Sequence, residues 1–191
     1  MQPAALATFL YLLSQWRHIM DDFRKLVRSL VREDFKRFDK RVRDLEKRQD
    51  DEGCGEFLGS CFFLAAVRRF DPDDAVVDII RFVANTRIVY DLTGRDIDPT
   101  AAERLIRTAL GEHDPLEDLD AHKVRKLEIV LVHKLLIDED LDDEGLDDFL
   151  HDAELLAQRW RAQSAVEVLQ GMGYTVKAPI STATRQDRLA S

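Results

Sequence analysis

The first fifty residues carry apolar residues at regular helical spacing, and no Gly or Pro occurs between Ala4 and Glu52. Spacings of four and three alternate, which is typical of one face of an α-helix. This seam consists of Phe9, Leu13, Trp16, Met20, Phe23, Val27 and Leu30, and it continues after a one-residue slip as Val31, Phe35, Phe38, Val42 and Leu45. Such a slip keeps one stripe facing a partner when a turn holds 3.6 residues. The pattern predicts a coiled-coil-like helix of about 45 residues, on the order of 65 Å long.

The rest of the chain predicts five shorter helices. Asp-Pro pairs precede several of them, and each offers an Asp N-cap followed by Pro at the first helical position, where its missing N–H costs nothing. These pairs are Asp71-Pro72, Asp98-Pro99 and Asp114-Pro115. Gly53, Gly94 and Gly111 fall between the periodic segments. We expect helices at about 55–70, 72–92, 99–110, 120–138 and 143–171.

The expected fold is therefore an all-α helical bundle. Residues 1–50 would form the long amphipathic helix and residues 51–172 the bundle, while residues 173–191 would be a short extended segment and a flexible tail. In the helix at 72–92, apolar positions indicate a single core face formed by Val76, Ile79, Ile80, Val83 and Tyr90.

Charge is distributed unevenly along the chain. The net charge is −9, yet residues 1–50 sum to +4 and residues 51–191 sum to −13. An acidic chain argues against general nucleic-acid binding, because contacts to phosphates need a basic face. We expect the basic and acidic parts to complement each other within one fold or assembly.

Cys54 and Cys61 are the only cysteines. Seven residues apart on one predicted helix, their Cα atoms would lie roughly 10 Å apart, too far for a disulfide. Two unpaired cysteines favour a reducing compartment. The apolar run from Ala4 to Leu13 has no basic residue before it and no cleavage site after it, and it is too short to span a membrane. The sequence therefore predicts a cytoplasmic location.

One group of side chains suggests metal chemistry. His122 and His133 lie eleven residues apart on one predicted helix, about 16 Å of rise, so they cannot ligate the same metal. His151-Asp152 follows His122 after about thirty residues. A lone His and a later Leu-His-Asp in a helical stretch resemble the HD-domain metal-dependent phosphohydrolases. The resemblance implies a divalent metal at His122, His151 and Asp152.

That family has a further Asp ligand well downstream, and here Asp187 is the only Asp after Asp152. We therefore expect surface or helix-end histidines and no cofactor, with the metal-dependent hydrolase as the first alternative. A second alternative is a membrane-surface helix, because basic residues follow the apolar start of the chain. Acidic residues lie among these basic ones and lower the local field, as expected for the solvated flanks of a coiled coil.

The seam is the feature that indicates most about function, because a small domain cannot cover so long a stripe with its own residues. We predict a non-catalytic interaction or assembly protein that binds itself or another protein through the seam. Arg outnumbers Lys by 20 to 8, which points to a bacterial source. The interaction residues would be Phe9, Leu13, Trp16, Met20, Phe23, Val27, Leu30, Phe35 and Phe38.

Overall fold

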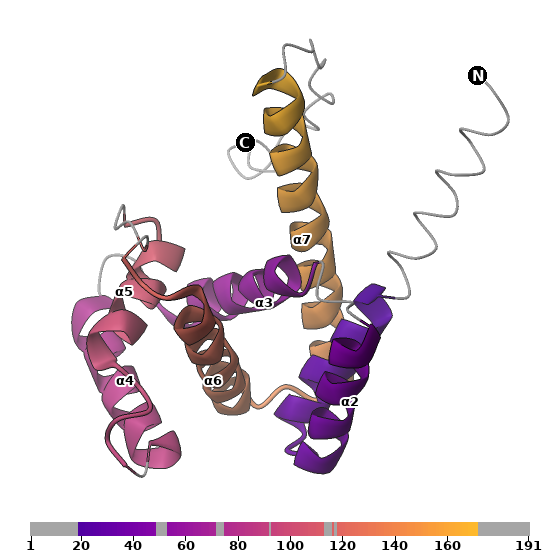
Figure 1. Ribbon diagram of the computed structural model, residues 1–191. Helices are drawn as coiled ribbons and strands as arrows, with labels where there is room; N and C mark the ends of the chain where they lie inside the picture. The colour runs from indigo at the N-terminus through magenta and orange to yellow at the C-terminus, as the bar shows by residue number, and fades with distance from the viewer. Residues whose placement is uncertain are drawn as a thin grey trace, which may run out of the picture. The chain divides into compact units, whose positions relative to one another are not determined.

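A computed structural model describes residues 19–48, 53–71, 75–91, 93–112, 116 and 118–171. Every regular element in these ranges is an α-helix, so the all-α prediction is confirmed. The five expected shorter helices lie within a few residues of their expected bounds (Figure 1). They are α3 (Cys54–Arg69), α4 (Ala75–Tyr90), α5 (Pro99–Ala109), α6 (Ala121–Glu139) and α7 (Asp143–Gly171). The extended segment and tail expected at 173–191 lie outside the described residues.

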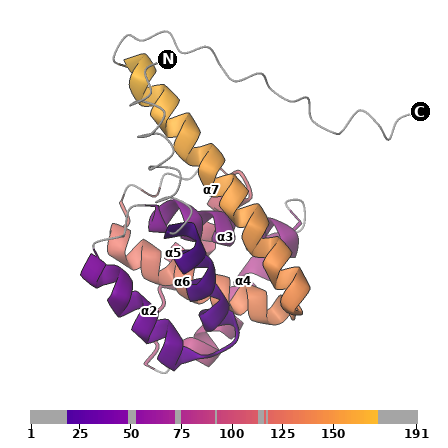
Figure 2. The ribbon, with the colours of Figure 1, turned by 90° about the vertical axis from the view of Figure 1, so that its right-hand side faces the viewer.

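The prediction of one continuous helix of about 45 residues is wrong. A first helix covers residues 19–31 of the described chain, residues 32–34 are not helical, and α2 (Phe35–Arg48) follows. The chain turns between these two helices (Figure 2). The one-residue slip in the seam, at Leu30 and Val31, lies directly before this break. It marks the end of a helix and is not an adjustment within one continuous helix.

Local hydrogen bonds account for the break. Glu33 has a φ of 53°, in the left-handed region that usually favours Gly. Its N–H donates to the Leu30 carbonyl at 3.0 Å, and the Asp34 N–H donates to the Ser29 carbonyl at 2.9 Å. This pair of bonds is a Schellman helix end, here without glycine. The Asp34 carboxylate then accepts the Arg37 N–H at 3.1 Å and so caps the first turn of α2.

Aspartates also begin α5 and α6. The Asp98 carboxylate accepts the N–H groups of Thr100 and Ala101, and Pro99 occupies the first helical position as expected. Asp120 caps α6 by accepting the Lys123 N–H at 2.9 Å. Pro72, Asp114 and Pro115 lie outside the described residues, so the other two Asp-Pro caps stay predictions.

The core of the described bundle centres on α3, which packs against α5 and α6, while α4 packs against α5 and α6 (Figure 1). Residues 19–31 add Phe23, whose ring stacks on that of Phe57 in α3 with centroids 6.2 Å apart. The Ser60 hydroxyl, buried on α3, donates to the Ala153 carbonyl of α7 at 2.7 Å. Because α3 contacts elements from both ends of the unit, it is the central helix against which the others pack.

Opposite charges join residues 19–32 to the acidic first half of α7. Arg24 pairs with Glu154 at 3.4 Å, Arg28 pairs with Asp147, and Arg32 pairs with Asp143 at 2.7 Å. The order of the partners shows that the two helices run antiparallel. The basic start and the acidic remainder of the chain therefore complement each other within one fold, one of the two arrangements that the charge distribution predicts. The chain up to Gln158 forms one compact unit, and α7 continues from Arg159 into a second.

Candidate functional site

The seam residues of the first helix lie in the protein's own core. Met20, Phe23, Val27 and Leu30 are all buried, with Phe23 only 1% exposed. Phe35 is 50% exposed and Phe38 is half-buried. Phe9, Leu13 and Trp16 lie outside the described residues. The part of the seam between 20 and 30 is therefore covered by helices of the same chain and is not free for a partner.

A different helix leaves apolar side chains uncovered. On α4, five large aliphatic residues have exposed fractions between 46% and 76%, with Ile88 the highest. They are Val76, Val77, Ile80, Ile88 and Val89. Helical spacing places four of them, together with the exposed Ala84, along one stripe that we call the α4 face: Val76, Val77, Ile80 and Ile88.

The expectation of a single core face on this helix is thus wrong in part. Ile79 and Val83 are buried as expected, but Val76 and Ile80 are exposed. The opposite side of α4 fills the core with Ile79, Phe82, Val83 and the hydroxyl of Thr86, which donates to the Phe82 carbonyl at 2.8 Å. When nearly all sides of a helix are apolar, we expect other helices or a partner to cover more than one of them. Within the described residues, other helices cover only one side of α4.

Basic residues border the α4 face. Arg81 lies 3.7 Å from Asp78 on the same helix, and Arg87 lies 3.8 Å from Asp91. Arg87 also donates to the Gly94 carbonyl at 3.1 Å, which holds it over the loop that follows α4. An apolar stripe with a charged border is typical of a surface that binds another protein.

The loop after α4 is organised around one buried carboxylate. Asp91 accepts the N–H groups of Arg95, Asp96 and Ile97 at 3.0 to 3.2 Å. Burial acts to raise the pKa of Asp91, but these backbone donors outweigh it and hold the pKa at about 2. At neutral pH the ionised Asp91 therefore holds the backbone of residues 95–97 beside the end of α4.

Beside this end of α4, His133 of α6 is buried between two aromatic rings. Its ring centroid lies 6.0 Å from that of Phe35 and 5.4 Å from that of Tyr90. Its Nε2 atom is buried and has no hydrogen-bond partner among the described residues. Burial lowers the pKa of His133, Glu33 acts to raise it, and Lys134 acts to lower it. Burial, Glu33 and Asp138 together raise the pKa of Tyr90.

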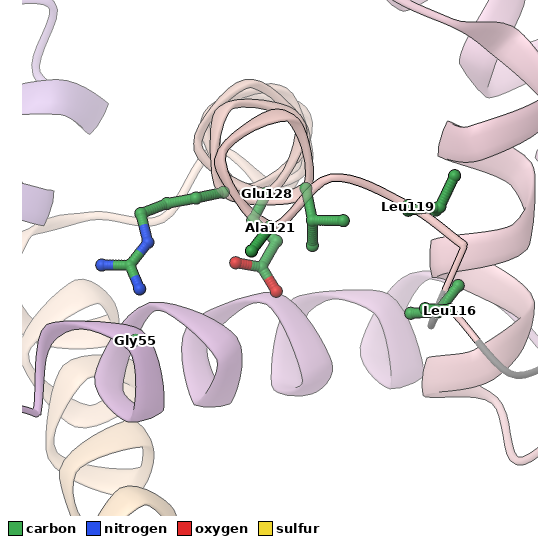
Figure 3. Close-up of a pocket in the computed structure, with 7 residues that line it drawn as sticks. Gly55, Leu116, Leu119, Ala121 and Glu128 are labelled. Carbon is green, nitrogen blue, oxygen red and sulfur yellow. The ribbon is translucent and has the colours of Figure 1, made fainter.

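A small pocket lies between the start of α3 and the first half of α6 (Figure 3). It has a volume of about 360 Å³, with walls formed by Gly55, Leu116, Leu119, Ala121, Val124, Arg125 and Glu128. The Glu128 side chain extends from α6 toward α3 (Figure 3). Burial raises the pKa of its carboxyl to about 7, and the nearby Arg125 only partly offsets this. No sequence pattern marks this pocket, because isolated Arg and Glu residues are common on helices.

The side chains of the hydrolase alternative are all exposed. His122 lies in the first turn of α6, and His151 and Asp152 lie on α7. In the part of the chain that the structure describes, no three His, Cys, Asp or Glu side chains come close enough to hold a metal ion. Cys54 and Cys61 are not joined by a disulfide. The described residues therefore do not bring His122, His151 and Asp152 together as a set of metal ligands.

Comparison of the chain with models of known protein families, with curated proteins and with solved structures found no match. No helix in the described ranges has the length and apolar composition that crossing a bilayer requires. The α4 face and the pocket beside Glu128 are two surfaces of the described residues that a partner or a small ligand can reach.

Proposed function

We propose that this protein is a non-catalytic helical interaction protein that associates with a second copy of itself through the α4 face. The observation that carries the proposal is the exposure of Val76, Val77, Ile80 and Ile88 along one stripe of a well-formed helix. Leaving such a stripe in water forgoes burial worth roughly 25 cal/mol per Å² of apolar surface.

Self-association covers this surface without requiring a partner other than the chain itself. In an antiparallel pair related by a two-fold axis, the same stripe on both copies is covered at once. With the axis near the middle of α4, Val77 of one copy faces the region of Ile88 in the other, and Ile80 faces the region of Ala84. The small Ala84 side chain allows the two helices to approach closely at the centre of the contact.

The test is the mass of the protein in solution over a concentration series, measured by light scattering coupled to size exclusion. We expect the mass to rise toward that of a dimer, and Ile88→Asp to return it to that of one chain of 22.0 kDa. Asn85→Asp is the matched control, because it adds the same charge to an exposed position of α4 outside the stripe.

Two results would contradict the proposal. One is a mass of one chain at every concentration up to about 100 µM, where even a weak dimer with a micromolar dissociation constant forms. The other is a dimer that Ile88→Asp leaves unchanged, which would place the contact elsewhere, for example in the seam residues outside the described ranges. Circular dichroism on both variants checks that the fold is retained.

A further inference from the structure

The pocket beside α6 contains two charged side chains that lie one turn apart on the same helix. Arg125 and Glu128 are at positions three residues apart, where an Arg and a Glu on a helix surface often meet. Here they form no ion pair, and within the described residues neither charged group accepts or donates a hydrogen bond. Two opposite charges are thus present in one small pocket without a hydrogen-bond or ion-pair partner among the described residues.

Packing against α3 explains why the two charges stay apart. The Arg125 guanidinium lies beside Gly55 so closely that a Cβ atom there would be only 3.1 Å from its Nη2. Gly55 therefore leaves the space that this guanidinium occupies. The Glu128 carboxylate turns toward the pocket, as its side chain in Figure 3 shows.

The remaining walls are apolar, and the space is small. Leu116, Leu119, Ala121 and Val124 line the pocket next to the carboxylate. A volume of about 360 Å³ is at the lower end of the range of roughly 300 to 1,000 Å³ for ligand pockets. It has room for a molecule of the size of one amino acid. A half-buried carboxylate that receives no hydrogen bond from the described residues is unfavourable for the protein alone, because the lost water is not replaced.

We propose that this pocket binds a small zwitterion with an apolar side chain, such as an aliphatic amino acid. Its ammonium group is held by Glu128, its carboxylate by Arg125, and its side chain lies against Leu116, Leu119 and Val124. The proposal is independent of self-association through α4, because none of these residues belongs to the α4 face.

This arrangement makes binding depend on pH. Glu128 must be ionised to hold an ammonium group, and burial raises its pKa to about 7. Arg125 is the other charged side chain of the pocket. Binding is therefore expected to strengthen between pH 6 and pH 8 and to release a proton at pH 7, because the ammonium favours the ionised carboxylate.

The experiment is isothermal titration calorimetry on the full chain with three matched probes. L-Leucine carries both charges, L-leucinamide carries the ammonium alone, and 4-methylpentanoate carries the carboxylate alone. We expect leucine to bind at least about tenfold more tightly than either probe with one charge, since each lost charged contact weakens binding by about this factor or more. Titrations of leucine in two buffers with different ionisation enthalpies detect the released proton.

Two variants assign the contacts. Glu128→Gln should weaken leucine and leucinamide by about tenfold or more and leave 4-methylpentanoate unchanged. Arg125→Gln should weaken leucine and 4-methylpentanoate and leave leucinamide unchanged. The matched controls are Glu144→Gln and Lys126→Gln, which remove the same charges at exposed positions outside the pocket. We expect Glu128→Gln to fold, because the amide has nearly the shape of the protonated carboxyl, and circular dichroism checks this.

Three results would overturn the proposal. The first is the absence of heat and of a thermal shift with leucine up to about 10 mM, a range that includes very weak binding of small ligands. The second is equal binding of leucine and leucinamide, which would remove Arg125 from the site. The third is leucine binding that Glu128→Gln does not change.

Discussion

The helix at 19–31 and α4 have similar apolar patterns but very different surroundings. In the first helix, Met20, Phe23 and Val27 all point into the core, and arginines on an outer side pair with α7. In α4, Ile79 and Val83 are buried, whereas Ile80 and Ile88 are exposed. The comparison teaches that apolar spacing identifies a helix but does not show what covers it. The part of the seam between residues 20 and 30 is covered by helices of its own chain, whereas α4 keeps exposed apolar side chains on one side.

The largest expected effect tests the difference in burial directly. Phe23→Ala removes a fully buried ring that stacks on Phe57, and we expect it to lower the free energy of unfolding by about 3–5 kcal/mol. Ile88→Ala removes a side chain that is 76% exposed, and we expect a change within about 0.5 kcal/mol. Urea unfolding of both variants, at a concentration where the protein is monomeric, measures the contrast. Similar losses in the two variants would show that the helices do not differ in this way.

A second prediction concerns His133, which lies between Tyr90 at the end of α4 and Phe35 at the start of α2. Because burial lowers its pKa, the unfolded chain binds a proton more readily than the folded one. Stability should therefore fall as the pH drops below about 6.5, the value for a free imidazole, and continue to fall down to the pKa of the folded state. Glu33 opposes this shift and Lys134 supports it.

Urea unfolding at pH 7.5, 6.5 and 5.5 measures this dependence. His133→Leu should be less sensitive to acid than the natural chain over this interval. The exposed His122→Leu, at the other end of α6, should keep the natural dependence. An unchanged slope in His133→Leu would assign the acid sensitivity to other groups.

A third prediction tests whether the first helix ends before Glu33 or continues into α2 as one long helix. Glu33 has a φ of 53°, so Glu33→Gly should stabilise the protein by about 0.5–1 kcal/mol. In one continuous helix, the same change would destabilise it by about 1 kcal/mol, because Gly is a poor helix former. The sign of the change in thermal unfolding decides between them. Asp140→Gly is a second case with the same expected sign, since Asp140 has a φ of 51° at the end of α6.

The smallest expected effect concerns the ion pairs between the first helix and α7. Arg28→Ala breaks the pair with Asp147, both partly exposed, and we expect a loss of about 0.2–1 kcal/mol. The loss should shrink as salt is raised to 1 M, because the charges are then screened. Arg81→Ala on α4, whose pair with Asp78 joins residues of the same helix, should cost less. Comparing the two variants in low and high salt shows whether ion pairs with α7 stabilise the packing of the first helix.

Much of the fold was predictable from particular residues. Asp98 and Pro99 mark the start of α5, and the helix lies where this pair places it. The break at Glu33 was missed because its signal is weak. A Schellman end normally shows a Gly, and here only the slip at Leu30 and an Asp that can cap a new helix point to it. The seam itself stays a prediction for Phe9, Leu13 and Trp16.

The candidate sites were less accessible to sequence reasoning. Ile80 and Ile79 are neighbours of the same residue type, yet one is exposed and the other is buried. Arg125 and Glu128 at helical spacing suggest an ordinary surface ion pair, and only the closeness of Gly55 shows that the guanidinium is turned toward α3. These outcomes depend on which distant segment lies opposite each side chain.

The sequence by itself determined the helices and most of their ends, because caps, turns and helical periodicity act between residues within about five positions of each other. Only the tertiary structure decided that Met20 and Phe23 are buried, with Phe23 against Phe57 of α3. It also decided that the α4 face stays exposed and that the Glu128 carboxylate faces a pocket. Burial is a property of contacts between distant parts of the chain, and the apolar character of a residue is the same whether or not another helix lies on it.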